Sequence, residues 1–190
     1  VPLALDGRLE GDGVNSTYAG HVDMQNLAPQ WGVDAFSGDF SGDWRGLSFD
    51  KINGRVLSGE IAGRAGLQWH QHYVAHVELM GTAIDIGQIY AEHPTNLDIS
   101  LQGDWSRSSG GESWSLEVPL VSGTWRDLGV HGLLKASSGD GALRIESLQL
   151  NGDGLQLSAQ GSPQNRLNYE GRVDQLQNWW PEGAGSIAAR

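Results

Sequence analysis

The sequence predicts an all-β protein in which antiparallel strands form one curved sheet with an apolar face, and three observations support this. Apolar and polar residues alternate with a period of two through most of the chain, which places one face of a strand against apolar matter and the other in water. Short turn signals separate the alternating segments, as in an antiparallel meander. No segment has convincing helical spacing.

The alternating segments follow one another along the whole chain. In each of them, apolar or small residues occupy every second position and polar residues lie between them. The segment 47–57 is the least regular, because Lys51 and Arg55 disturb the alternation. The regular segments are 3–9, 14–24, 57–69, 73–79, 97–105, 114–120, 128–134, 155–161 and 167–173.

Turns are expected where Asn, Asp and Gly cluster, because these residues tolerate the positive φ of tight hairpins. Residues 107–112 read as a longer loop between two strands. Pro94 and Pro163 fall in connections, where the missing N–H does no harm. The clearest tight turns lie at 11–13, 138–141 and 151–154.

Small side chains on the apolar face indicate that the interior is incompletely filled. Many of these positions are Gly, Ala or Ser, and the 190 residues include 28 glycines. A closed barrel or a two-sheet sandwich must fill its interior with side chains. A curved sheet with one open apolar face fits the pattern better, although the residues alone leave a filled sandwich open. The chain begins at Val1, apparently within a strand, so residues 1–190 read as one segment of a longer β-sheet domain without an internal boundary.

Composition and charge exclude several classes of function. The net charge is −11, with 12 basic and 23 acidic residues, and an acidic surface repels phosphate backbones, so no nucleic-acid partner is expected. There is no cysteine, and hence no disulfide, thiolate metal site or cysteine nucleophile. No apolar run reaches the length of a membrane helix and no signal peptide is visible.

Histidines form the one cluster that could suggest a metal. His70, His72 and His76 would share a face at strand spacing, but a turn interrupts the run near Gln71 and no carboxylate stands beside it to complete a zinc site. The Asp-Gly turns carry too few oxygens for calcium. We therefore expect no metal and no cofactor.

No residue set marks a catalytic centre. The chain has no G-x-S-x-G nucleophile elbow, and its carboxylates occur singly on the polar side of strands. Asp34 and Asp39 flank an aromatic stretch without forming an acid and base pair. The chain is therefore not expected to be an enzyme. Trp69, Trp105 and Trp114 lie on the apolar side of strands, where rings can line a groove rim, stack on sugars or pack a core.

One sequence pattern recurs along the chain: alternating apolar residues, a glycine, a turn, and then a short L-x-L or L-x-x-L-x-L motif. This order of weak motifs resembles the TamB family, the inner-membrane subunits of the translocation and assembly module, within the wider AsmA-like, bridge-like lipid transfer proteins. The resemblance covers most of the chain, best from about Ser58 to Arg190. The segments on which the resemblance depends are 58–69, 76–81, 84–86, 96–103, 121–128, 143–150, 155–161, 173–176 and 180–185.

The resemblance implies a U-shaped, taco-like sheet with an apolar concave groove. It implies a periplasmic segment of a protein held in the inner membrane by an N-terminal helix, which this chain lacks. It also implies a link to outer-membrane biogenesis, autotransporter assembly and phospholipid transport. The expected partners are phospholipid acyl chains and, through other parts of the full-length protein, the BamA-like outer-membrane barrel TamA.

Together, these observations predict a hydrophobic groove that shields phospholipid acyl chains, or nascent outer-membrane protein strands, across the periplasm. The alternative is a β-sandwich that binds carbohydrate through exposed Trp. The residues expected to line the groove share the apolar side of their strands: Leu67, Val77, Leu79, Ile84, Ile86, Leu97, Ile99, Leu101, Leu116, Val118, Val130, Leu134, Leu143, Ile145, Leu155, Leu157, Leu167, Tyr169 and Val173.

Overall fold

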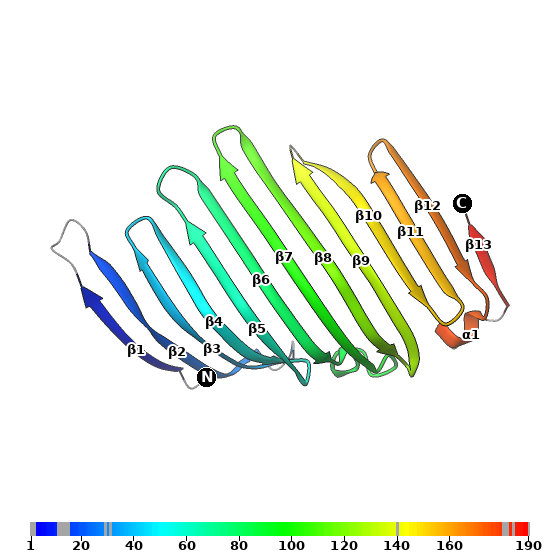
Figure 1. Ribbon diagram of the computed structural model, residues 1–190, viewed down its shortest axis with the longest axis horizontal. Helices are drawn as coiled ribbons and strands as arrows, with labels where there is room; N and C mark the ends of the chain where they lie inside the picture. The colour runs from blue at the N-terminus through cyan, green and yellow to red at the C-terminus, as the bar shows by residue number, and fades with distance from the viewer. Residues whose placement is uncertain are drawn as a thin grey trace.

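A single antiparallel sheet makes up almost the whole fold. The computed structural model describes residues 3–10, 16–28, 30, 32–139, 141–179, 183 and 185–189. Within these residues, 13 strands are hydrogen-bonded in the order in which they occur in the sequence (Figure 1). The predicted all-β, antiparallel, one-sheet architecture is thus confirmed. The sandwich alternative is wrong, because no second sheet is present in the described part of the chain.

Each strand pairs with the next one along the chain. The strands are β1 Leu3–Glu10, β2 Thr17–Ala28, β3 Val33–Asp43, β4 Gly46–Val56, β5 Gly59–Gln68, β6 Tyr73–Ile84, β7 Thr95–Ser108, β8 Gly111–Trp125, β9 Leu128–Gly139, β10 Ala142–Gly152, β11 Leu155–Ser162, β12 Arg166–Val173 and β13 Ile187–Ala189.

Short turns join most strands. Asp153 and Gly154 connect β10 to β11, and Gly154 has a φ of +73°, as predicted for 151–154. The longer loop expected at 107–112 is wrong: β7 continues to Ser108 and β8 starts at Gly111. A hydrogen bond between the hydroxyls of Ser106 and Ser113 (2.8 Å) holds this hairpin close to its tip. The turn expected at 11–13 lies outside the described residues, and 138–141 is described except for residue 140.

β-bulges explain where the alternation is irregular. In β4 the register shifts between Phe49 and Ile52, and Lys51 has a φ of +50°. A bulge adds one residue to a strand and so changes the parity of the alternation, which places Phe49 and Ile52, three residues apart, on the same face. Residues 47–56 therefore belong to one strand, β4, although the alternation within it is interrupted.

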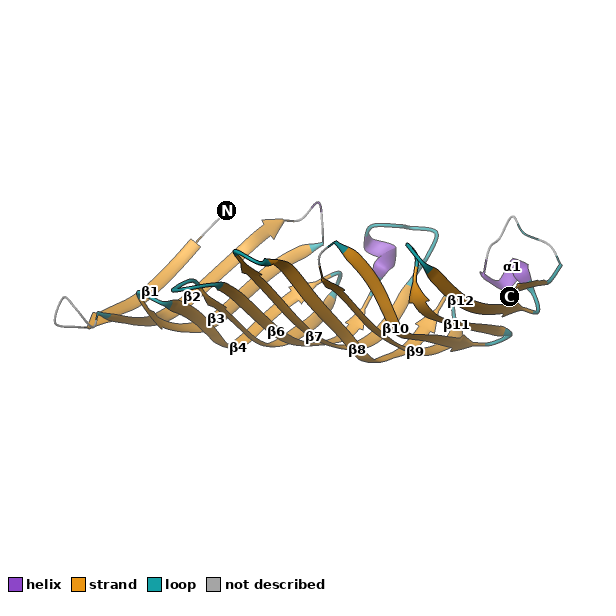
Figure 2. Ribbon diagram, turned by 90° about the horizontal axis from the view of Figure 1, so that it is seen from above, coloured by secondary structure: helices purple, strands orange, loops and turns teal. Residues whose placement is uncertain are grey.

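The sheet is curved and open. Figure 2 shows the strands bending around a common axis, with β1 and β13 at opposite ends of the molecule. In the described part of the chain, no side chain is less than 2% exposed, because a one-layer sheet has no second layer to cover it. None of the described helices has the length and apolar content to cross a bilayer.

A cluster of buried residues lies at one rim of the sheet. Ile84, Leu97 and Val130 are 5–7% exposed and form a cluster. The connection from β6 to β7, which contains the 3-10 helix η2 (Ile86–Gln88), and Trp179 of helix α1 (Leu176–Trp179) pack against this cluster. Two short segments thus cover one end of the apolar face.

Candidate functional site: the apolar face

The strand register gathers the apolar side chains on one face of the sheet. Residues directly opposite each other in neighbouring antiparallel strands point to the same side. Leu79 lies opposite Leu101, and Ile99 lies opposite Val121. One row crosses five strands in register, from Val77 through Gly103, Leu116 and Ala136 to Ile145. The register therefore continues the apolar face from strand to strand.

The residues expected to line a groove share this face, with one exception. Ile86 lies outside the strands, in η2, and packs against the buried cluster from the side. Ile84, Leu97, Val118 and Val130 are buried. Leu67, Leu167 and Tyr169 are 39%, 36% and 49% exposed. The other members are half-buried: Val77, Leu79, Ile99, Leu101, Leu116, Leu134, Leu143, Ile145, Leu155, Leu157 and Val173.

The same face includes residues that the prediction left out, some of them in strands β2, β3 and β4 for which no residue was predicted. Phe36 and Phe40 in β3 lie in register with β4, where Phe40 is opposite Phe49, and Phe49 is in contact with both rings. Their spacing of four residues is even, which could have assigned them to one face. Further residues of this kind are Tyr18, Val22, Met24, Ile52, Ile61, Val121, Leu148 and Leu150.

Large side chains on the apolar face lie over glycines of the same strand or of the neighbouring strand. A β carbon added to Gly81 would lie 3.1 Å from Cγ1 of Ile84, and one added to Gly103 would lie 3.1 Å from Cγ1 of Val77. These glycines let the large side chains lie close to the backbone. Among the described residues, the connection that contains η2 and Trp179 of α1 pack over this face at the buried cluster.

Two of the three tryptophans that were expected on the apolar side of strands lie at one border of this face. Trp105 lies directly opposite Trp114, and its indole N–H donates to Oε1 of Glu112 (2.7 Å). Such a ring has one apolar side and one hydrated edge. Trp69 instead lies in the turn after β5, where its indole N–H donates to the backbone carbonyl oxygen of Trp44 (2.8 Å).

The opposite face, here called the outer face, is polar and carries ion pairs that run across strands. Arg64 donates two hydrogen bonds to Glu78, at 2.7 and 2.9 Å. His76 contacts Asp104 at 2.7 Å and Glu78 at 3.0 Å. The hydrogen bonds from Arg64 and His76 lower the pKa of Glu78 to about 2. Those to Asp104 and Glu78 raise the pKa of His76.

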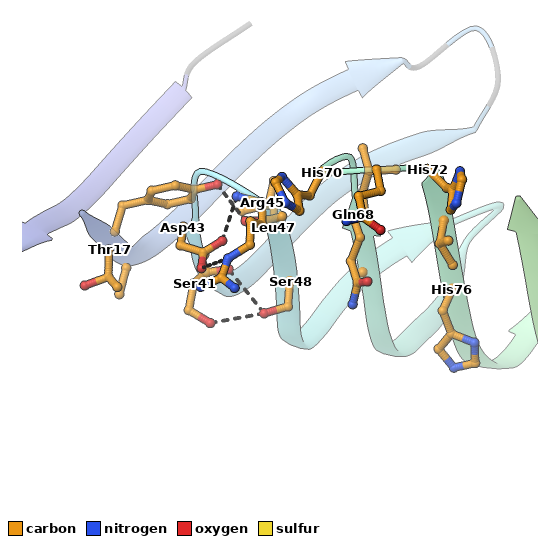
Figure 3. A pocket seen from close by; sticks show the side chains of 18 residues that line it. Thr17, Ser41, Asp43, Arg45, Leu47, Ser48, Gln68, His70, His72 and His76 are labelled. Atoms are coloured by element: carbon orange, nitrogen blue, oxygen red, sulfur yellow. Dashed lines mark hydrogen bonds and ion pairs between the residues drawn. The ribbon is translucent and has the colours of Figure 1, made fainter. Parts of the chain in front are cut away.

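The three clustered histidines do not share one environment. His70 and His72 lie in the turn between β5 and β6, whereas His76 points from β6 to the outer face (Figure 3). His70 packs edge-on against Trp44, with ring centroids 4.3 Å apart. All three histidines border an open hollow of about 1120 Å³, together with residues such as Ser41, Ser48 and Gly66. Among the described residues, no group of three or more His, Asp or Glu side chains is arranged to hold a metal ion.

Comparison with known proteins identifies the family. No curated protein and no solved structure matches the chain. The family model described as TamB, N-terminal domain, matches residues 5–190. This match covers nearly the whole chain, so it confirms the resemblance inferred from the recurring sequence pattern. The chain belongs to the TamB family.

Proposed function

We propose that the apolar face is a hydrophobic groove that shields phospholipid acyl chains, or nascent outer-membrane protein strands, between the inner and the outer membrane. Proteins of the TamB family act in outer-membrane assembly together with TamA, and they are periplasmic proteins anchored in the inner membrane. The chain contributes a stretch of the groove to such a protein. The step proposed for it is solvation of an apolar cargo, without bond chemistry, catalytic residues or a cofactor.

The observation that carries this proposal is the continuity of the apolar rows across strands. A cargo moving along the sheet would pass from Val77 to Leu116 and on to Ile145 without leaving apolar contact. A buried CH₂ group is stabilised by about 0.8 kcal/mol, so an acyl chain of about 16 carbons would need on the order of 10 kcal/mol to cross water unaided. A continuous apolar surface removes most of this barrier.

We also propose that residues 1–190 are one segment of a longer sheet. In the described part of the chain, β1 pairs only with β2, and β13 pairs only with β12. Each of these two strands thus has a backbone edge at which a further strand can pair. Added strands would lengthen the same apolar face.

Native mass spectrometry of the purified chain tests the proposed cargo. Phospholipid should accompany the wild-type protein and the variant Ser100→Asp, in which the new charge is on the outer face. Ile99→Asp, one residue away on the apolar face, should lose the lipid. The proposal fails if neither the wild-type protein nor Ser100→Asp carries phospholipid, or if Ser100→Asp and Ile99→Asp carry it equally. It also fails if the wild-type chain binds a glycan saturably and carries no lipid.

A further inference from the structure

An apolar stripe interrupts the polar outer face. Its exposed large side chains are Met80 in β6 and Leu120 in β8, which are 64% and 49% exposed. Both lie opposite Ser100 of β7, one on each side of it. The outer stripe, as it is called here, consists of Ala62, Met80, Leu120 and Leu133, and it runs from β5 to β9 across Ser100 of β7.

A bulge in β8 places Leu120 in the outer stripe. Alternation of Trp114, Leu116, Val118 and Leu120 predicted one face for all four, and for Leu120 this prediction is wrong. The register with β9 shifts between Val118 and Val121. Val118 is buried on the apolar face whereas Leu120 is exposed. Bulges commonly redirect a side chain, and Pro119, which has no N–H to donate, is tolerated there.

The surroundings of the outer stripe favour a positively charged partner. On one side, Arg64 is paired with Glu78, and Lys135 is shared between Glu117 and Glu146, so both cations are already compensated. On the other side lie Glu60 and Asp98. Glu60 lies directly opposite Arg55 in β4. Asp98 lies opposite Ser122 and has no partner among the described ion pairs, so Asp98 and the second carboxylate on Lys135 leave negative charge beside the outer stripe. The whole chain carries a net charge of −11, which opposes the approach of a second copy or of an anionic lipid surface.

We propose that the outer stripe is a docking site for a partner protein that presents apolar side chains flanked by Lys or Arg. Strands lie about 4.8 Å apart, so a stripe over five strands is roughly 19 Å long, which suits a short segment of polypeptide. The unbranched, polarizable side chain of Met80 adapts to varied apolar partners. Complementary charge around the stripe would direct the partner and fix its orientation.

Binding of two synthetic peptides to the purified chain tests this proposal by fluorescence anisotropy. One peptide alternates leucine with lysine, and the other alternates leucine with glutamate. The lysine peptide should bind, and added salt should weaken it. The variant Met80→Ser/Leu120→Ser should bind it at least tenfold more weakly. The control Leu67→Ser/Tyr169→Ser removes two exposed side chains from the apolar face and should bind within about twofold of wild type. Met80→Lys, at a position where a charge is tolerated, should also weaken binding without changing the melting temperature.

Several results would overturn the proposal. The first is absence of lysine-peptide binding, and the second is equal binding of the glutamate peptide. A third is a loss of binding in the Leu67→Ser/Tyr169→Ser control alone, which would place the peptide on the apolar face. The last is a wild-type dimer in sedimentation that Met80→Ser/Leu120→Ser abolishes, because a second copy would then be the occupant.

Discussion

Leu79 of β6 lies directly over Gly63 of β5 on the apolar face. A β carbon added to Gly63 would lie 2.9 Å from Cδ2 of Leu79 and would also collide with the carbonyl oxygen of Glu78. Gly66, three residues further along the same strand, points to the outer face, and a β carbon there would meet only Leu47 O, at 3.9 Å. Close approach between strands is therefore required on one face of β5 but not on the other.

Substitution of these two glycines should have opposite consequences. Gly63→Ala forces the backbone or Leu79 to move, and overpacking of this kind costs about 1–3 kcal/mol of unfolding free energy. Gly66→Ala has room and reduces the entropy of the unfolded chain, so it should be neutral or stabilising by up to about 1 kcal/mol. Urea unfolding of both variants measures the difference. Equal effects would show that Gly63 is not needed for packing.

Thr95 should control how firmly the connection between β6 and β7 covers the buried cluster. Its hydroxyl donates to the carbonyl oxygen of Ile84 (3.0 Å) and accepts from the N–H of Ile86 (2.8 Å), and the residue is 8% exposed. Thr95→Val leaves both backbone groups without this partner and should cost about 1–3 kcal/mol. Thr95→Ser keeps the hydroxyl and should cost less. Hydrogen exchange at Ile86 should become faster in Thr95→Val only; unchanged protection would contradict this role.

The stability contributed by His76 should depend on pH. Hydrogen bonds to Asp104 and Glu78 raise the pKa of His76 above its ordinary value of 6.5. The protonated ring therefore stabilises the fold fully below about pH 6.5, and this contribution is lost as the pH rises through the raised value. Glu78, with a pKa of about 2, stays ionised throughout this range.

Melting temperatures of wild type and His76→Gln measure this dependence. His76→Gln should have a lower melting temperature than wild type at pH 5.5, and the difference between the two melting temperatures should be smaller at pH 9. His72→Gln, in the turn after β5, is the matched control and should show no such trend. A gap for His76→Gln that is constant or widens with pH would be incompatible with this assignment.

Two arginine substitutions on the same strand and the same face should behave differently. Ile99 is half-buried, and in Ile99→Arg the long side chain can reach water along the open face, so the protein should remain folded while lipid carriage falls. Leu97 is 5% exposed beneath the connection that contains η2, and Leu97→Arg buries an unpaired charge, which should unfold that rim or the whole chain. Circular dichroism melts distinguish the two. Unfolding of both variants would show that the apolar face is filled rather than open.

Period-two patterning was sufficient for the strands and for most of the apolar face. Leu97, Ile99 and Leu101 alternate with Asp98, Ser100 and Gln102, and the register places these two sets on opposite faces. A one-residue slip would exchange the sets, so the register is strongly determined. This explains why the alternation of these six residues agrees with the observed strand register.

Where the prediction failed, bulges and local contacts decided the outcome. Leu120 changed faces because β8 contains an additional residue near Pro119, and a proline is only a weak signal of a bulge. The hairpin at 107–112 is tight because of side-chain pairs near its tip, such as Ser106 with Ser113. The place of Leu120 in the outer stripe follows from the same bulge and could not be predicted from alternation, whereas alternation alone places Met80, next to Leu79, on the outer face.

Site-specific photo-crosslinking in cells tests the central claim most directly. A photoreactive residue at Ile99 or Leu101 faces the apolar side, and one at Ser100 or Gln102 faces the outer side of the same strand. Phospholipid crosslinks are expected at positions 99 and 101 and none at positions 100 and 102. Phospholipid captured equally at all four positions, or at none of them while the protein remains folded, would contradict the claim that the apolar face carries lipid.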